Sequence, residues 1–209
     1  APPKTKKTFF ISLLASCYLS GSNQFGGDIK GHKGNDGQLV HIDTEQGLWH
    51  CQKVFERVHK MDSNIDSEIY HTFGLRSIDY KMRIEFIDYY LREKIKTPSL
   101  VIIDGIADLC SDANNISESN QVVQKLMEWS AKYKCHIINV IHQNFGSSKL
   151  GTGHLGSFLE KKAETVIQLE ANTVNKDWVT VKCGRSRGYA FETFSFEVNE
   201  FGLPQIVGV

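Results

Sequence analysis

Two adjacent residues near the N-terminus, Lys7 and Thr8, are the first that could do chemistry, because they directly precede a long apolar stretch. An amine and a hydroxyl at the start of a helix are typical of a phosphate-binding loop, in which the lysine reaches the outer phosphates and the hydroxyl holds Mg²⁺. The pattern G-x-x-x-x-G-K-[ST] has two glycines, and the corresponding positions here are Ala1 and Lys6. If position 6 needs a positive φ, its side chain costs about 1–2 kcal/mol. A plain basic start to a helix is the alternative interpretation.

Asp104 ends the apolar run of residues 100–103. Runs of this kind are typical of strands buried on both faces of a parallel sheet, and open α/β sheets bind ligands at the carboxyl ends of their strands. The carboxylate would hold Mg²⁺ beside the Thr8 hydroxyl. The alternative is a turn that begins at Asp104 and Gly105.

Glu45 follows a short predicted strand over residues 38–42. At that place it could act as a general base that orients a water molecule for attack on a γ-phosphate. A structural role is also compatible with the sequence, because Thr44 could cap the next helix and an acidic residue favours a helix N-terminus.

Further candidates follow later strands. His142 and Gln143 come after the apolar run 137–141, where side-chain hydrogen-bonding groups would suit detection of a phosphate. A polar start to a loop is the alternative. Arg185 and Arg187 lie between two predicted strands, where they form either a solvated turn or arginine fingers that reach the nucleotide of a neighbouring subunit.

The elements that must position these residues alternate between strand and helix before the pattern changes. Helical spacing of apolar residues predicts helices over 8–19, 45–61, 81–95 and 122–133, and short apolar runs predict strands over 38–42, 69–73, 100–103 and 137–141. Polar or glycine-rich composition predicts loops over 21–37, 111–120 and 144–157. Four strands with turn signals between them follow, over 165–169, 178–182, 191–198 and 204–209.

This alternation predicts an α/β fold with a mostly parallel sheet, and we expect the last strands to extend that sheet. The candidate residues before residue 144 would then line one edge of it, because the carboxyl ends of parallel strands lie together.

The composition is that of an ordinary globular domain, and the 209 residues fit a single one. The 24 Lys+Arg and 24 Asp+Glu give zero net charge, which excludes a strongly basic nucleic-acid binder but not a local basic patch. No apolar run approaches the length of a membrane span. The basic start before residues 9–19 is also compatible with a signal peptide, but we prefer the phosphate-loop interpretation. Five cysteines without a CxxC pair favour a reducing compartment, so we expect a cytoplasmic protein.

In chain order these segments resemble the motifs of RecA-like P-loop ATPases, and the nearer relatives are RepA-type hexameric helicases and ATPases of plasmids and mobilizable transposons. Pro3-Lys4-Thr5-Lys6-Lys7-Thr8 resembles a degenerate Walker A motif, and Leu100-Val101-Ile102-Ile103-Asp104 resembles Walker B. The segment 41–46 resembles the one that carries the family's catalytic glutamate. Residues 141–144 resemble the sensor motif, and Arg185-Ser186-Arg187 resembles the basic finger pair.

The resemblance implies one RecA-like ATPase domain over residues 1–209, without the strand that usually precedes the P-loop. Its fold would be a mostly parallel, twisted sheet between helices, with antiparallel strands at the C-terminal end. ATP would be bound by Lys4, Thr5, Lys6, Lys7 and Thr8. Mg²⁺ would be held by Thr8 and Asp104.

The resemblance also implies roles for the other candidates. Glu45 would activate water, and His142 or Gln143 would sense the γ-phosphate. Arg185 and Arg187 would complete a neighbour's site in a homo-oligomer such as a hexameric ring. DNA, expected to be single-stranded, would contact the loops 111–120 and 144–158.

Three functions compete. The first is an ATP-hydrolysing, helicase-like protein that acts on DNA in the replication or mobilization of a mobile element. The second is a catalytically degenerate RecA-like module that binds nucleic acid or partners without turnover, which Lys6 in place of glycine supports. The third is a nucleotide-dependent regulatory protein of the circadian-clock ATPase type.

Overall fold

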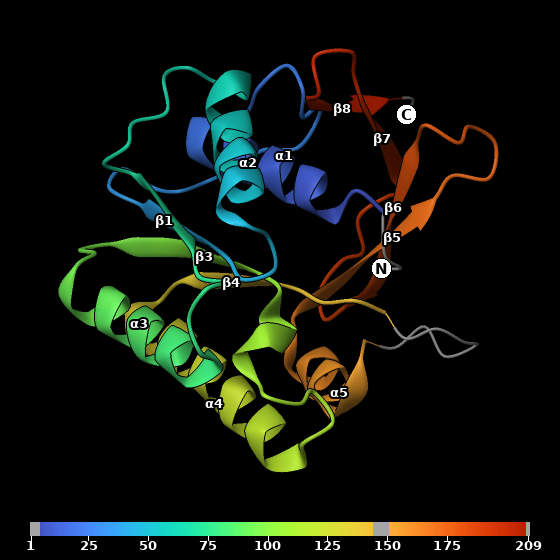
Figure 1. Cartoon of the computed structure of the whole chain (residues 1–209). Coiled ribbons are helices and arrows are strands. Elements are labelled where there is room, and N and C mark those ends of the chain that lie inside the picture. The colour runs from blue at the N-terminus through green and yellow to red at the C-terminus, as the bar shows by residue number, and fades with distance from the viewer. Residues whose placement is uncertain (1–4, 144–150, 208–209) are drawn as a thin grey trace.

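The computed structural model describes residues 5–143 and 151–207, which form two sheets with helices packed around them (Figure 1). Lys4 and residues 144–150 of the second predicted DNA-binding loop lie outside the described residues. The elements in chain order are α1 (Lys7–Ser20), β1 (Gln38–Asp43), α2 (Leu48–Met61), β2 (Tyr70–Gly74), α3 (Tyr80–Glu93), β3 (Pro98–Asp104), the 3-10 helix η1 (Ile106–Leu109), α4 (Ile116–Tyr133), β4 (His136–Val140), α5 (Gly153–Lys162), β5 (Thr165–Ala171), β6 (Val179–Ser186), β7 (Phe194–Val198) and β8 (Pro204–Val207).

The first sheet is parallel throughout and has the strand order β2-β1-β3-β4. The α/β fold predicted from the alternation of strands and helices is therefore confirmed. In the central pair of strands, Asp43 of β1 lies directly opposite Asp104 of β3. The two carboxylates thus end neighbouring strands at the same edge of the sheet.

Both faces of the parallel sheet are covered, and the residues of β3 alternate between them. Leu100 and Ile102 pack with the apolar residues of α1 and α2, whereas Val101 and Ile103 pack with those of α3 and α4. All four are buried. Alternate residues of a strand point to opposite faces, so a strand covered on both sides must be apolar at every position.

Helix α1 lies between the two sheets (Figure 1), which explains why it is apolar on all sides. Ile11 and Ala15 pack against the parallel sheet, whereas Phe10 and Leu13 pack against the antiparallel one. The ring of Phe10 stacks on that of Phe196 in β7, with 5.6 Å between the ring centroids. A helix with two buried faces has no stripe left for polar residues.

The C-terminal strands form an antiparallel sheet of their own, in the order β5-β6-β7-β8. The expectation that they extend the parallel sheet is wrong, because no ladder joins β4 to β5 in the described part of the chain. The physical reason lies in α1, whose second apolar face needs a surface that the parallel sheet cannot provide.

The segments 111–120 and 144–157 were predicted as loops, but helices begin within both of them, which corrects the prediction of their secondary structure. Helix α4 already begins at Ile116, because the Asn115 side chain accepts hydrogen bonds from two backbone N–H groups of its first turn. Helix α5 begins at Gly153, within the predicted glycine-rich loop. A Cβ on Gly156 would lie 2.2 Å from the Gly151 carbonyl carbon, so these glycines serve close packing of the backbone as well as turns.

Among the described helices, none combines the length and the apolar character that crossing a bilayer requires.

Candidate functional site

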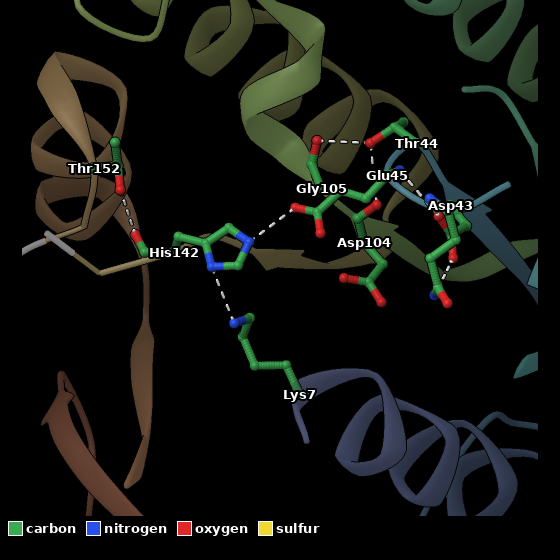
Figure 2. Close-up of polar contacts among 9 residues, drawn as sticks. Lys7, Asp43, Thr44, Glu45, Asp104, Gly105, His142 and Thr152 are labelled. Atoms are coloured by element: carbon green, nitrogen blue, oxygen red, sulfur yellow. Dashed lines mark hydrogen bonds and ion pairs between the residues drawn. The ribbon is translucent and has the colours of Figure 1, made fainter. Parts of the chain in front are cut away.

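The carboxyl edge of the parallel sheet faces the first turn of α1. Glu45 follows β1, Asp104 ends β3, and His142 follows β4. Lys7 is the first residue of α1. Figure 2 shows the side chains of these four residues converging from separate segments, with the His142 ring between Lys7 and Glu45.

The residue before α1 has the backbone conformation that the sequence pattern anticipates for a glycine. Lys6 is the N-cap of the helix, with φ 54° and ψ 31° in the left-handed region. Its amine donates to the backbone carbonyl of Asp177, at 2.8 Å, in the turn between β5 and β6. The Lys6 side chain is therefore bonded to the turn between β5 and β6. The left-handed backbone of Lys6 costs about 1–2 kcal/mol.

A chain of polar contacts joins Lys7 to Glu45 through His142. The Lys7 amine lies 3.2 Å from His142 Nδ1, and His142 Nε2 lies 3.4 Å from Glu45 Oε1. An ammonium can only donate, so this arrangement places the ring proton on Nε2, where it faces the carboxylate. Burial lowers the pKa of Lys7, whereas the nearby carboxylates of Glu45 and Asp104 oppose that shift.

Asp104 is the most deeply buried carboxylate of the candidates, with 3% of the residue exposed. Burial raises its pKa to about 7, and the charges of Asp43 and Glu45 add to the shift. A hydrogen bond from the Thr8 hydroxyl and the charge of Lys7 act in the opposite direction.

The second oxygen of this carboxylate, Asp104 Oδ2, is buried without a hydrogen-bond partner among the described residues. A buried acceptor without a partner is costly, and a bound cation would satisfy it. Carboxylate and hydroxyl oxygens are ligands that Mg²⁺ prefers, and the Thr8 hydroxyl already lies at the Asp104 carboxylate. The residues present therefore fit a Mg²⁺ ion.

Thr44 joins the ends of β1 and β3. Its backbone N–H donates to the Asp104 carbonyl at 3.0 Å, and its hydroxyl reaches the carbonyl oxygens of Asp104 and Gly105 at 3.1 and 2.8 Å. The interpretation in which Thr44 caps the next helix is wrong, since α2 begins at Leu48 after Gly47. The Thr44 hydroxyl instead donates to backbone carbonyls at the end of β3.

Asp43 is a component of the site that the sequence interpretation missed. Its carboxylate accepts the backbone N–H groups of Glu45 and Gln46, at 3.0 and 2.8 Å, and the Gln46 side-chain amide at 2.7 Å. The signal was available, because an aspartate at the end of a strand commonly bonds the backbone two residues ahead in a turn.

The remaining candidates occupy other places. Gln143 forms an isolated bridge with Gly151. Arg185 and Arg187 are exposed, and their guanidinium groups each donate at 3.3 Å to a backbone carbonyl near the end of α5, those of Glu160 and Lys161. Of the two residues suggested as a γ-phosphate sensor, the structure brings His142 into contact with Lys7 and Glu45.

Comparison with known proteins agrees with this architecture. A solved structure described as an ATPase domain is similar to this chain, with a TM-score of 0.66 and 16% sequence identity. The match covers 100% of this chain and 82% of the solved chain, which shows that the two share a fold. No curated protein matches the sequence. A family described as AAA domain matches residues 1–147, a span that includes Lys7, Glu45, Asp104 and His142. Because this match covers well over half of the sequence, the chain belongs to the AAA domain family.

Proposed function

We propose that this chain binds ATP with Mg²⁺, hydrolyses it, and uses the cycle as a helicase-like protein on DNA. The observation that carries the proposal is the convergence of Lys7, Thr8, Asp104 and Glu45 where the sheet edge meets the first turn of α1. A phosphate-binding amine, two oxygen ligands for a cation and a candidate base are the components that phosphoryl transfer requires.

The start of α1 is suited to bind the triphosphate. The backbone N–H groups at the start of a helix attract anions, and Lys7 adds a positive charge there. The left-handed conformation of Lys6 supplies the turn that a glycine usually supplies. Since the Lys6 amine is bonded to Asp177, that side chain is directed to the β5–β6 turn.

Thr8 and Asp104 would hold Mg²⁺, which neutralises phosphate charge when it is bound. Glu45 is the candidate base, because it is the carboxylate of the cluster that stays partly exposed, at 37% of its side chain, and can reach a water molecule. Its contact with His142 would hold the carboxylate in place.

His142 is suited to report the presence of a γ-phosphate. In the structure its two ring nitrogens contact Lys7 and Glu45. A phosphate bound by the Lys7 amine would compete with His142 Nδ1, and the ring would then be bonded to Glu45 alone. Binding of the nucleotide would in this way be transmitted to the base and to the segment after β4.

The finer parts of the proposal rest on the resemblance in the sequence. Arg185 and Arg187 would act in a neighbour's site within a homo-oligomer, such as a hexameric ring. Single-stranded DNA would contact the segments 111–120 and 144–158. We place the protein in the cytoplasm and in the replication or mobilization of a mobile element.

One observation supports a second function. Lys6 stands where the phosphate-loop pattern has glycine, so a degenerate module that binds DNA or partners without turnover is the alternative. The two functions differ in whether the base of the cluster is used.

Release of inorganic phosphate from Mg·ATP, with and without single-stranded DNA, separates the two. We expect turnover in the unmodified chain and a loss of about 10²-fold or more in Glu45→Gln, the usual contribution of a general base. Glu85→Gln, at an exposed position of α3, is the matched control and should leave turnover unchanged. DNA binding without phosphate release in the unmodified chain would favour the degenerate module.

A further inference from the structure

Glu45 lies in a segment without regular secondary structure, between the end of β1 at Asp43 and the start of α2 at Leu48. A residue there gains no support from a helix or a ladder, yet a general base must be held in place to work. Two of the backbone N–H groups of this turn, those of Glu45 and Gln46, donate to Asp43 Oδ1. The second oxygen, Oδ2, accepts the Gln46 amide at 2.7 Å. Both oxygens of the Asp43 carboxylate are therefore used to fold the turn.

The position of Asp43 is itself fixed. The residue is fully buried at the end of β1, and its carbonyl accepts the N–H of Leu75 at 2.8 Å. Its register opposite Asp104 ties it to β3. The carboxylate thus connects the turn that carries Glu45 to the central strands of the parallel sheet.

The other side of the turn rests on the end of β3. A Cβ on Gly105 would lie 2.3 Å from the Thr44 hydroxyl and 2.6 Å from Glu45 Cγ, so the glutamate stem packs directly on bare backbone. Together, Asp43 and Gly105 leave the Glu45 carboxylate directed at His142 (Figure 2).

We infer that Asp43 is a positioning residue for hydrolysis: its carboxylate folds the turn 43–47 and so sets where the Glu45 carboxylate lies. This inference rests on the proposed function. It assigns Asp43 no contact with nucleotide, so its main effect should pass through Glu45. The charge of Asp43 also raises the pKa of Asp104, and Asp43→Asn, which removes the charge but keeps the turn, separates that effect from the position of Glu45. Binding of nucleotide by Lys7 and Thr8 should change little when Asp43 is replaced.

A double-mutant cycle tests this dependence. Turnover and the Kd for a fluorescent ATP analogue with Mg²⁺ would be measured for Asp43→Ala, Glu45→Gln and the double variant. Asp43→Asn serves as the conservative variant, because its side-chain oxygen can still accept both backbone N–H groups. Asp66→Ala is the matched control, since Asp66 accepts the N–H of Glu68 at 2.8 Å in a similar turn on an exposed segment before β2.

We expect Asp43→Ala to lower kcat about 10- to 100-fold, the scale of a misplaced catalytic group, with Kd changed less than about threefold. The double variant should be no slower than Glu45→Gln alone, and Asp43→Asn should recover most of the loss. Asp66→Ala should leave kcat unchanged.

Several outcomes would overturn the inference. One is that Asp43→Ala slows turnover as much in the Glu45→Gln background as in the unmodified chain. If alanine prevents folding, Asp43→Asn is compared in the same way. Another is a Kd that weakens in step with kcat, which would mean a general loss of structure. Normal turnover in Asp43→Ala would overturn this inference alone, whereas absence of turnover in the unmodified chain would overturn the proposed function with it.

Discussion

Replacement of Gly105 by alanine tests both the stability and the geometry of the site. Gly105 has φ 102°, and a side chain at positive φ costs about 1–2 kcal/mol. The new Cβ would lie 2.3 Å from the Thr44 hydroxyl, which would have to leave its carbonyl acceptors at a cost of about 1–3 kcal/mol. Alanine lowers the entropy of the unfolded chain, which offsets about 0.4–1 kcal/mol. The net expectation is a loss of about 2–4 kcal/mol in the free energy of unfolding.

Chemical denaturation followed by circular dichroism measures this loss directly. For a chain of this length the same change lowers Tm by about 5–15 °C. Gly188→Ala is the matched control. Gly188 has no positive φ, and in the described part of the chain no atom beyond its two chain neighbours would lie within 4 Å of an added Cβ. The stability of this variant should change by less than about 1 kcal/mol. If the two variants were equally stable, the close packing of Thr44 and Glu45 on Gly105 would be refuted.

Three further predictions concern the core, the loop before α1 and pH. Leu13 is fully buried between the two sheets, so Leu13→Ala should lower the free energy of unfolding, measured by denaturation, by about 3–5 kcal/mol. Leu48 is 78% exposed, and Leu48→Ala should change the free energy of unfolding by less than about 0.5 kcal/mol. Equal losses in the two variants would contradict the placement of α1. Lys6→Gly should be more stable than Lys6→Ala by about 1 kcal/mol, because both lose the bond to Asp177 and only alanine retains the left-handed strain; the reverse order would argue against φ 54°. Burial lowers the pKa of His41 to about 3. Below about pH 6.5 the imidazole is therefore protonated in the unfolded chain but not in the folded chain. This difference should lower the free energy of unfolding by about 2 kcal/mol between pH 7 and pH 5. Denaturation of His41→Asn at both pH values should show a loss of stability, from pH 7 to pH 5, that is about 2 kcal/mol smaller than in the unmodified chain. The same loss in both proteins would contradict a buried neutral imidazole at His41.

The convergence of Lys7, Asp104, Glu45 and His142 was predictable from the sequence for a simple reason. Three of them follow short apolar runs, and the carboxyl ends of parallel strands share one edge of a sheet. Lys7 precedes an apolar helix that must pack on that sheet. Local patterns therefore determined which residues meet, although not the contacts they make.

Features that depend on partners far away in the chain were not predictable. The left-handed Lys6 is bonded to a carbonyl 171 residues later, and no local signal indicates that partner. The glycine-rich composition of residues 144–157 indicates flexibility, but Gly151 and Gly156 within it pack closely, backbone against backbone. The separate antiparallel sheet follows from the second apolar face of α1, which the sequence shows only as a helix that is apolar all round.

The Mg²⁺-dependent affinity for a fluorescent ATP analogue, compared between the unmodified chain and Lys7→Ala, tests the central claim most directly. Loss of a charge-assisted contact of about 1.5–3 kcal/mol predicts a Kd weaker by about 10- to 150-fold. Lys60→Ala, at an exposed position of α2, should bind as the unmodified chain does. Equal affinity in Lys7→Ala and Lys60→Ala, or binding that does not respond to Mg²⁺, would contradict a nucleotide site built from Lys7, Thr8 and Asp104.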